Sequence, residues 1–232
     1  MMASLATAQT VQRTDPAESD GPDGRRRILD EAAGLFLERG YAATSLRGIA
    51  AAAGMKAGSL YYHFESKEAL FQAILRRGLD VMVEAFREAT AASRDQPGRA
   101  RIEAHVRAHL AALFEHGPYT RVHVTTFHTA PEAVRASIVP LRDAYEAMWT
   151  ELLEELAARR EIAIDTPIRL SRLILFGAMN STFDWFDPER GDVDGVARTI
   201  TRQVWLGLAH SDVPDPDAAA AAAAAGSEGN VS

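Results

Sequence analysis

Apolar residues recur at steps of three and four along most of this chain, the spacing that places them on one face of an α-helix. Within residues 25–39, for example, Ile28, Ala32 and Phe36 share such a face. The pattern predicts helices over 25–39, 44–53, 56–62, 66–86, 99–115, 119–128, 131–158, 166–185 and 193–210. No segment alternates β-branched and polar residues as a half-buried strand does. We therefore expect an all-α protein of about nine helices.

Glycine and hydroxyl residues mark the ends of the first helices. Gly40 and Gly54 each follow a helical segment, and a left-handed C-cap favours glycine because it has no β-carbon. Ser45 and Ser66 can accept hydrogen bonds from the free backbone N–H groups at a helix start. The two short helices that meet at Gly54 have the form of a helix-turn-helix, whose second helix enters the DNA major groove.

Charge is distributed unevenly, although the whole chain carries a net charge of -7 at pH 7. Residues 25–77 hold nine Lys or Arg against five Asp or Glu, and they include both lysines of the chain. This asymmetry indicates a small domain that faces nucleic acid, joined to an acidic domain with another role. We divide the chain into a disordered arm (1–24), a helix-turn-helix domain (25–75), a ligand-binding and dimerisation domain (76–212) and a disordered Ala-rich tail (213–232).

The composition excludes several other classes of protein. The chain has no cysteine, which rules out disulfides, thiolate metal ligands and a cysteine nucleophile. It also has neither a signal peptide nor the run of roughly 20 apolar residues that spans a bilayer. We therefore expect a cytoplasmic protein with no membrane partner.

Polar side chains gather on the outward face of the predicted third helix. They are Lys56, Ser59, Tyr61, Tyr62 and His63. Hydroxyl and ammonium groups can contact phosphates or base edges, and tyrosine rings can pack on thymine methyl groups. The same pattern also fits half-buried core tyrosines, a hydrogen-bonded histidine and a merely solvated lysine.

The stretch TSLRGIAAAAGMKAGSLYYHFESKEAL resembles the DNA-binding domain of the tetracycline repressor family, a likeness that covers about residues 25–75. The resemblance implies DNA contacts by Ser59, Tyr61, Tyr62, His63 and Lys67. It also places Thr44, Ser45 and Arg47 near the phosphates, and Lys56 adjoins the same helix. Ala57 departs from the family, where many members have lysine or another polar residue, so the operator sequence is not inferable.

The resemblance further implies a homodimer on double-stranded, palindromic operator DNA. In the family the last two long helices form the dimer interface. Here they supply Leu170, Ile174, Gly177, Ile200, Val204 and Leu208. These apolar stripes equally fit the core of a single chain.

Aromatic and polar residues at helical spacing in the acidic part are the candidates for a small-molecule pocket. They are His109, Phe127, Tyr145, Trp149, Arg172, Phe176, Asn180 and Phe183. The segment LFGAMNSTFDWFDPERG resembles family members that respond to acyl-CoA thioesters, whose phosphates Arg101, Arg121, Arg169 and Arg172 could meet. The alternative is a filled core with no pocket.

We expect a transcriptional repressor that a hydrophobic or CoA-thioester ligand releases from its operator. A constitutive DNA-binding regulator without an effector is the main alternative. His105 and His109 stand at metal-ligand spacing, which keeps a helical metal-dependent enzyme as a remote alternative. No nucleophile with a base and no phosphate-cradling glycine loop appears, so we expect neither enzymatic activity nor a cofactor.

Overall fold

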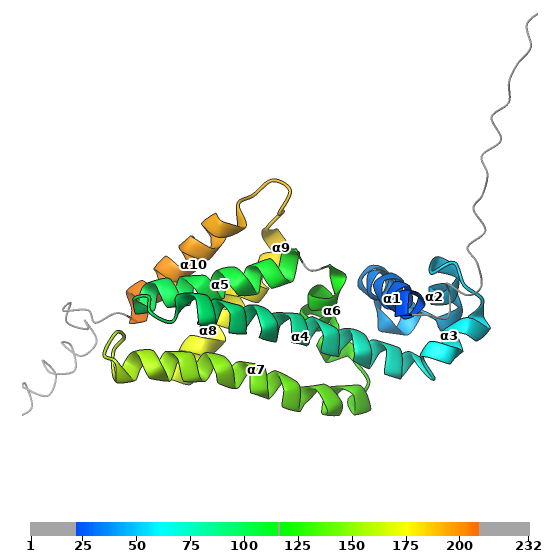
Figure 1. Cartoon of the computed structure of the whole chain (residues 1–232), viewed down its shortest axis with the longest axis horizontal. Helices are drawn as coiled ribbons and strands as arrows, with labels where there is room; N and C mark the ends of the chain where they lie inside the picture. The colour runs from blue at the N-terminus through cyan, green and yellow to red at the C-terminus, as the bar shows by residue number, and fades with distance from the viewer. Residues whose placement is uncertain (1–21, 116, 209–232) are drawn as a thin grey trace, which may run out of the picture. The chain divides into compact units, whose positions relative to one another are not determined.

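The computed structural model describes residues 22–115 and 117–208, and Figure 1 shows them as an arrangement of α-helices. The elements are α1 (Pro22–Ala43), α2 (Leu46–Ala52), α3 (Ala57–His63), α4 (Lys67–Ser93), α5 (Gly98–Phe114), α6 (Pro118–Thr126), the 3-10 turn η2 (Phe127–Thr129), α7 (Glu132–Ala158), α8 (Ile168–Asn180), α9 (Thr182–Trp185) and α10 (Val193–Leu208). The described residues contain no strand, so the predicted all-α class is confirmed. The predicted arm up to residue 21 and the predicted tail at 213–232 lie outside the described residues.

Several helix boundaries differ from the prediction; α4, for example, continues to Ser93, beyond the predicted end at residue 86. Helix α1 begins at Pro22, inside the predicted arm, because proline and the acidic Asp23 both suit the first turn of a helix. The predicted helix over 166–185 is divided into α8 and α9 around Ser181. The Ser181 and Thr182 hydroxyls donate to the backbone carbonyls three residues earlier, and such bonds compete with the helical ladder.

The chain packs into two compact units. Among the described residues, the first unit consists of 22–88, 108–115 and 117–145, and the second unit consists of 89–107 and 146–208. The division of the sequence into domains at 25–75 and 76–212 stays a prediction.

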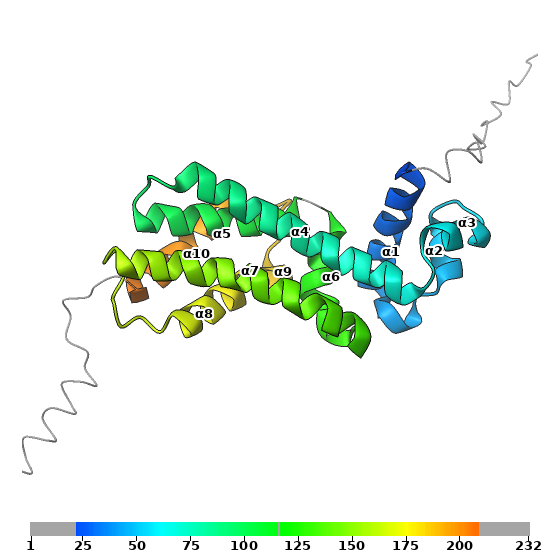
Figure 2. The same cartoon turned by 60° about the horizontal axis from the view of Figure 1, so that its bottom comes forward.

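The first unit has one continuous apolar core. Side chains of α1, α2, α3, α4, α6 and α7 contribute to it, including the fully buried Ile28, Phe36, Ile49, Leu60, Phe71, Val122 and Ile138. Figure 2 shows α1, α2 and α3 gathered at the first turns of α4, as Figure 1 does from another side. This packing holds the helix-turn-helix against a rigid support.

The second unit places α10 beside both α8 and the beginning of α5. The N–H of Ala163, in the α7–α8 connection, donates to the Leu208 carbonyl at 3.0 Å. On the other side, the Arg107 guanidinium of α5 pairs with Asp194 in the first turn of α10 at 2.8 Å. Helix α10 is therefore bound to the rest of the second unit near both of its ends.

Candidate functional site

Helix α3 turns its polar side chains outward and its apolar side chains inward. Leu60 is fully buried and Phe64 almost so, while Tyr61 is 57% and Tyr62 76% exposed. Lys56 is also exposed, and Ser59 and His63 are half-buried. The alternative of half-buried core tyrosines is therefore wrong.

The turn between α2 and α3 depends on Gly54. Its φ of 68° lies in the left-handed region, which glycine adopts without steric penalty. Behind the turn, Ile49, Ala53 and Leu60 are buried together in the core of the first unit. Small alanines on α2 allow α3 to approach closely, so the orientation of α3 follows that of α2.

The beginning of α2 is fixed by its own residues. Ser45 has extended backbone angles, and its Oγ accepts a hydrogen bond from the Gly48 N–H at 3.1 Å, as the sequence predicts for an N-cap. Arg47, in the first turn, is exposed and no ion pair involves it among the described residues. Its guanidinium remains available to an anionic partner.

Thr44 and Lys67, two of the residues expected near DNA, are engaged within the protein. Thr44 is buried, and its hydroxyl contacts the carbonyls of Gly40 at 2.8 Å and Leu35 at 3.2 Å. The Lys67 ammonium donates to the carbonyls of Tyr41 at 2.8 Å and Thr44 at 2.9 Å. Neither interaction is visible in the sequence, since each joins a side chain to a backbone oxygen.

In the first unit, three of the predicted ligand residues lie in aromatic contacts. His109 Nδ1 and the Tyr145 hydroxyl are 2.9 Å apart, and both residues are buried. Phe127 is half-buried, stacks on His123 and lies 4.3 Å from the Arg142 guanidinium. His109 and Tyr145 thus form a polar pair within an apolar interior.

The second unit contains the other predicted ligand residues. Trp149 is fully buried and packs edge-on against Phe176, with ring centroids 5.7 Å apart. Arg172 pairs with Glu146 at 2.9 Å and donates to the Thr150 hydroxyl at 2.7 Å. Asn180 and Phe183, at the end of α8 and in α9, are half-buried.

Two residues singled out for other chemistry have internal partners. Buried His105 donates through Nδ1 to the Arg101 carbonyl at 2.7 Å, and its Nε2 lies 2.9 Å from the Thr90 hydroxyl. Desolvation lowers the pKa of His105, so the ring is neutral and Nε2 accepts from Thr90. Arg101 pairs with Glu155 at 2.7 Å. Within the described ranges, no three His, Cys, Asp or Glu side chains are grouped as metal ligands.

An apolar groove of about 1060 Å³ runs between α8 and α10. Its lining includes Ile174, Ala178, Trp185, Phe186, Ile200 and Val204. Ile174 is 64% and Trp185 62% exposed, whereas Leu208 is buried at the end of the groove. Trp185 and Phe186 were not among the predicted site residues, although the aromatic run FDWF was a visible signal.

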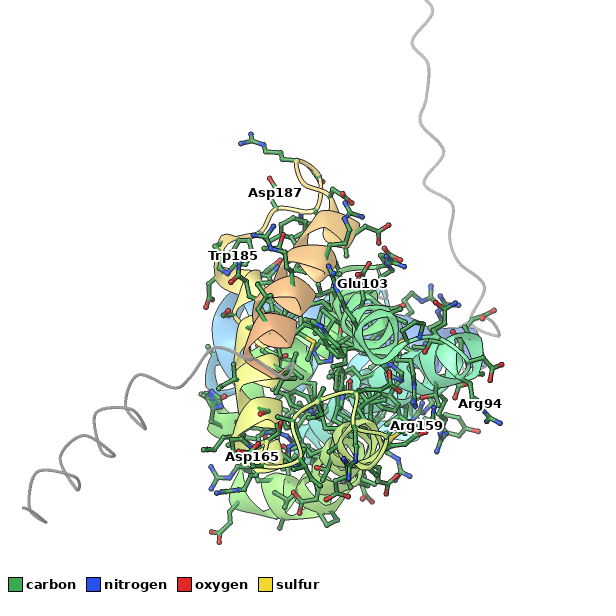
Figure 3. All side chains as sticks on the ribbon, turned by 90° about the vertical axis from the view of Figure 1, so that its left-hand side faces the viewer. Arg94, Glu103, Arg159, Asp165, Trp185 and Asp187 are labelled. Carbon is green, nitrogen blue, oxygen red and sulfur yellow. The ribbon has the colours of Figure 1, made fainter. Side chains whose placement is uncertain are left out.

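A smaller cleft of about 530 Å³ lies on the other side of α10, toward α5, and its lining includes Arg99, Arg198 and Arg202. Arg198 pairs with Asp192 at 2.9 Å, while Arg99 and Arg202 make no ion pair with the described residues. In Figure 3, Trp185 and Glu103 mark the two opposite sides of α10. The basic cleft was not predicted, because its arginines belong to two helices that are far apart in the sequence.

No helix in the described part of the chain is both long and apolar enough to cross a bilayer.

Comparison with known proteins assigns the chain to a family. Residues 28–74 match the bacterial regulatory proteins of the tetR family, and residues 95–208 match the tetracyclin repressor-like C-terminal domain. Over 195 residues, the chain is 33% identical to the HTH-type transcriptional repressor KstR2 of Rhodococcus jostii (strain RHA1), covering 83% of this chain and 95% of that protein. The chain belongs to the tetR family. It is therefore a DNA-binding transcriptional regulator, as the sequence predicts.

Solved structures of tetR-family regulators share this fold. PfmR from Thermus thermophilus has a TM-score of 0.69 and 26% identity, with 79% of this chain and 100% of that chain covered. AibR, whose structure contains isovaleryl coenzyme A and operator DNA, has a TM-score of 0.65 and 24% identity, with 79% and 97% covered. At this identity, the likeness to AibR shows the fold alone.

In this tetR-family regulator, α2 and α3 occupy the matched N-terminal region. The groove and the basic cleft lie within the matched C-terminal region. The predicted roles of individual residues in binding DNA, ligand and a second chain stay predictions.

Proposed function

We propose that this regulator is a repressor, which reads a palindromic operator with α3 as a homodimer and leaves it when a small hydrophobic metabolite binds. The observation that carries the proposal is the exposure of Tyr61 and Tyr62 beside the buried Leu60. Large aromatic side chains seldom face water on a well-anchored helix unless they meet a partner. Its relative KstR2 is named a repressor, which supports the same direction of control.

The proposed DNA-contacting surface consists of the accessible side chains of the helix-turn-helix. They are Ser45, Arg47, Lys56, Ser59, Tyr61, Tyr62 and His63. Arg47 and Lys56 supply charge for phosphates, and the tyrosines on α3 supply contacts to base edges and thymine methyl groups. We place Thr44 and Lys67 behind this surface, because their polar groups already bind backbone carbonyls.

The second copy of the chain is the proposed occupant of the groove between α8 and α10. Ile174 and Trp185 line the groove and are exposed, as is Leu170 one turn before Ile174 on α8, and exposed apolar patches of this kind mark interaction sites. The same face continues with Gly177, Ile200 and Val204, and Leu208 is buried at its end. A two-fold pair of chains presents two copies of α3, which a palindromic operator requires.

The proposed effector is a hydrophobic metabolite carried as a CoA thioester. The basic cleft supports this ligand class, since Arg99 and Arg202 offer guanidinium groups without an internal carboxylate. Arginine forks suit phosphate groups. AibR, a protein of the same fold, is described in complex with isovaleryl coenzyme A. None of the eight residues predicted to contact the ligand is among the residues that line this cleft, and their roles stay predictions.

The DNA-contacting surface is tested with duplexes that the full chain selects from a random library. Tyr62→Ala should weaken binding to the selected duplex, with a loss of about 1–3 kcal/mol in binding free energy. It should also broaden the sequence preference of the protein at the contacted base pair. Ile164→Ala is the control, because it removes an exposed apolar side chain that lies neither on α3 nor in the groove. Equal binding by the Tyr62→Ala and unaltered proteins would reject the contact.

The effector is tested by titrating the duplex-bound protein with an acyl-CoA series, with CoA alone and with the free fatty acids. Acyl-CoA should release the duplex, and Arg202→Ala should weaken that release. Arg94→Ala removes the same charge on another side of the second unit (Figure 3) and should not. Release by free fatty acids with no difference between the two variants would remove CoA from the proposal. If no compound affects binding of the duplex, the result would favour a constitutive regulator.

A further inference from the structure

The connection between α1 and α2 is held by the first two residues of α4. The Lys67 ammonium lies between the Tyr41 carbonyl at 2.8 Å and the Thr44 carbonyl at 2.9 Å. The final carbonyls of a helix have no partner within the helix. A lysine that binds them acts as a cap, and its positive charge interacts favourably with the negative end of the helix dipole.

The side chain of Tyr41 is held by the same end of α4. Lys67 Nζ lies 4.2 Å from the centre of the Tyr41 ring, and the Tyr41 hydroxyl donates to Glu68 Oε1 at 2.7 Å. Burial together with Glu68 raises the pKa of Tyr41, and the bond from Tyr41 lowers the pKa of Glu68. The ring also packs 4.8 Å from Phe71 on α4 and 5.7 Å from Phe36 on α1.

Thr44 joins this arrangement to the DNA-reading helices. Its hydroxyl binds the Gly40 carbonyl, where a φ of 78° interrupts α1, and its own carbonyl binds Lys67. The next residue, Ser45, is the N-cap of α2. The position of the Thr44 peptide therefore determines where α2 begins, and α3 packs directly on α2.

We propose that Lys67 and Glu68 form a clamp on Tyr41 and Thr44 that positions α2 and α3, and that Lys67 acts on DNA binding through this clamp and not by contacting a phosphate. Lys67 and Glu68 are thus positioning residues. The inference rests on the DNA-contacting surface proposed above. It assigns to Lys67 a role different from the phosphate contact that the sequence resemblance implies.

The salt dependence of binding separates the two roles. A lysine that neutralises a phosphate adds about 0.9 to the slope of log affinity against log salt concentration, whereas a positioning residue adds nothing to it. Lys67→Met retains the aliphatic stem and removes the charge. We expect it to lower affinity for the selected duplex about tenfold, with the slope and the affinity for random duplex unchanged.

Arg47→Ala is the matched control, since it removes an exposed cation from the same region. It should flatten the slope by about 0.9 for each chain, about 1.8 for the dimer, and weaken binding to selected and random duplexes alike. A flattened slope in Lys67→Met would show that Lys67 contacts a phosphate and would overturn the proposal. Unchanged affinity for the selected duplex would overturn it equally. A control without effect would instead count against the DNA-contacting surface itself.

A second variant keeps the test decisive if Lys67→Met does not fold. Tyr41→Phe removes only the hydroxyl that binds Glu68, and its effect should again be confined to the selected duplex. In the double variant with Lys67→Met and Tyr41→Phe, the loss of binding free energy should be smaller than the sum of the two single losses, because both changes disrupt the same clamp. Losses of affinity that add in the double variant would reject the positioning role. So would a loss that follows the unfolded fraction measured by circular dichroism and reduces binding to both duplexes.

Discussion

The guanidinium of Arg101 donates to the carboxylate of Glu155 at 2.7 Å, and the two partners differ sharply in exposure. The Arg101 side chain is 4% exposed and that of Glu155 is 42% exposed. Two further nitrogens of Arg101, Nε and Nη1, are buried without a partner among the described residues. The buried cation on α5 therefore depends on one carboxylate of α7.

Glu155→Gln should destabilise the protein, because it leaves the Arg101 charge buried without an anion. A loss of about 2 kcal/mol in the free energy of unfolding is expected, less than for a fully buried pair since Glu155 is partly exposed. Urea unfolding at pH 7 measures it, with the exposed Glu151→Gln on the same helix as control. The pKa of Glu155 is lowered chiefly by the Arg101 hydrogen bond. Its stabilisation is thus present above the unfolded pKa and lost as pH falls through the folded pKa, a loss that the variant should not show.

Gly78 on α4 allows close approach of the backbone of α6. A Cβ at this position would lie 2.5 Å from the Tyr119 carbonyl oxygen and 2.8 Å from its carbon. Because backbone atoms cannot move aside as a flexible side chain can, Gly78→Ala should destabilise the first unit by about 1–3 kcal/mol. Gly34→Ala on α1, where a Cβ meets nothing within 4 Å, should instead stabilise by about 0.5–1 kcal/mol. Equal effects of the two changes in urea unfolding would contradict the close approach.

His123 should make the protein sensitive to acid. Burial, with a smaller contribution from Arg142, lowers the pKa of His123 to about 4, and its Nδ1 donates to the Leu75 carbonyl at 3.0 Å. The unfolded chain binds a proton near pH 6.5, so stability falls as pH decreases from about 6.5 toward 4. This single group accounts for about 2 kcal/mol between pH 7 and pH 5.

His123→Asn retains a donor near the Leu75 carbonyl and removes the titration. The free energy of unfolding of this variant should vary less between pH 7 and pH 5 than that of the unaltered protein. His128→Asn, on the exposed 3-10 turn, is the control. A pH dependence that persists in full in His123→Asn would show that other groups cause it.

Charged substitutions in the groove between α8 and α10 should dissociate the proposed dimer. Ile174→Asp and Val204→Asp each place a charge on a face that the second chain is proposed to cover, where an unpaired buried charge is strongly unfavourable. Sedimentation should show monomers at concentrations where the unaltered protein is dimeric. Ile164→Asp, an exposed apolar position that does not line the groove, should leave the dimer intact. A dimer that survives both groove variants would place the interface elsewhere.

The local pattern of residues predicted the helix α3, but it did not predict the clamp that Lys67 and Glu68 form on Tyr41 and Thr44. The helical period placed Tyr61 and Tyr62 on the outward face of α3, and their exposure excluded the alternative of half-buried core tyrosines. For Lys67, the family resemblance implied a contact with DNA. Its bonds to Tyr41 and Thr44 go to backbone carbonyls, which every residue possesses, and no residue type signals them.

The sequence by itself determined the all-α class, the helix-turn-helix and the family, because helical periodicity, capping and glycine turns depend on residues within about four positions of one another. Only the tertiary structure decided that Lys67 caps α1, that Arg101 is a buried cation and that the arginines of α5 and α10 share one cleft. Those relationships join residues far apart in the chain. Their distances depend on how whole helices pack, and no local pattern of residue types records that packing.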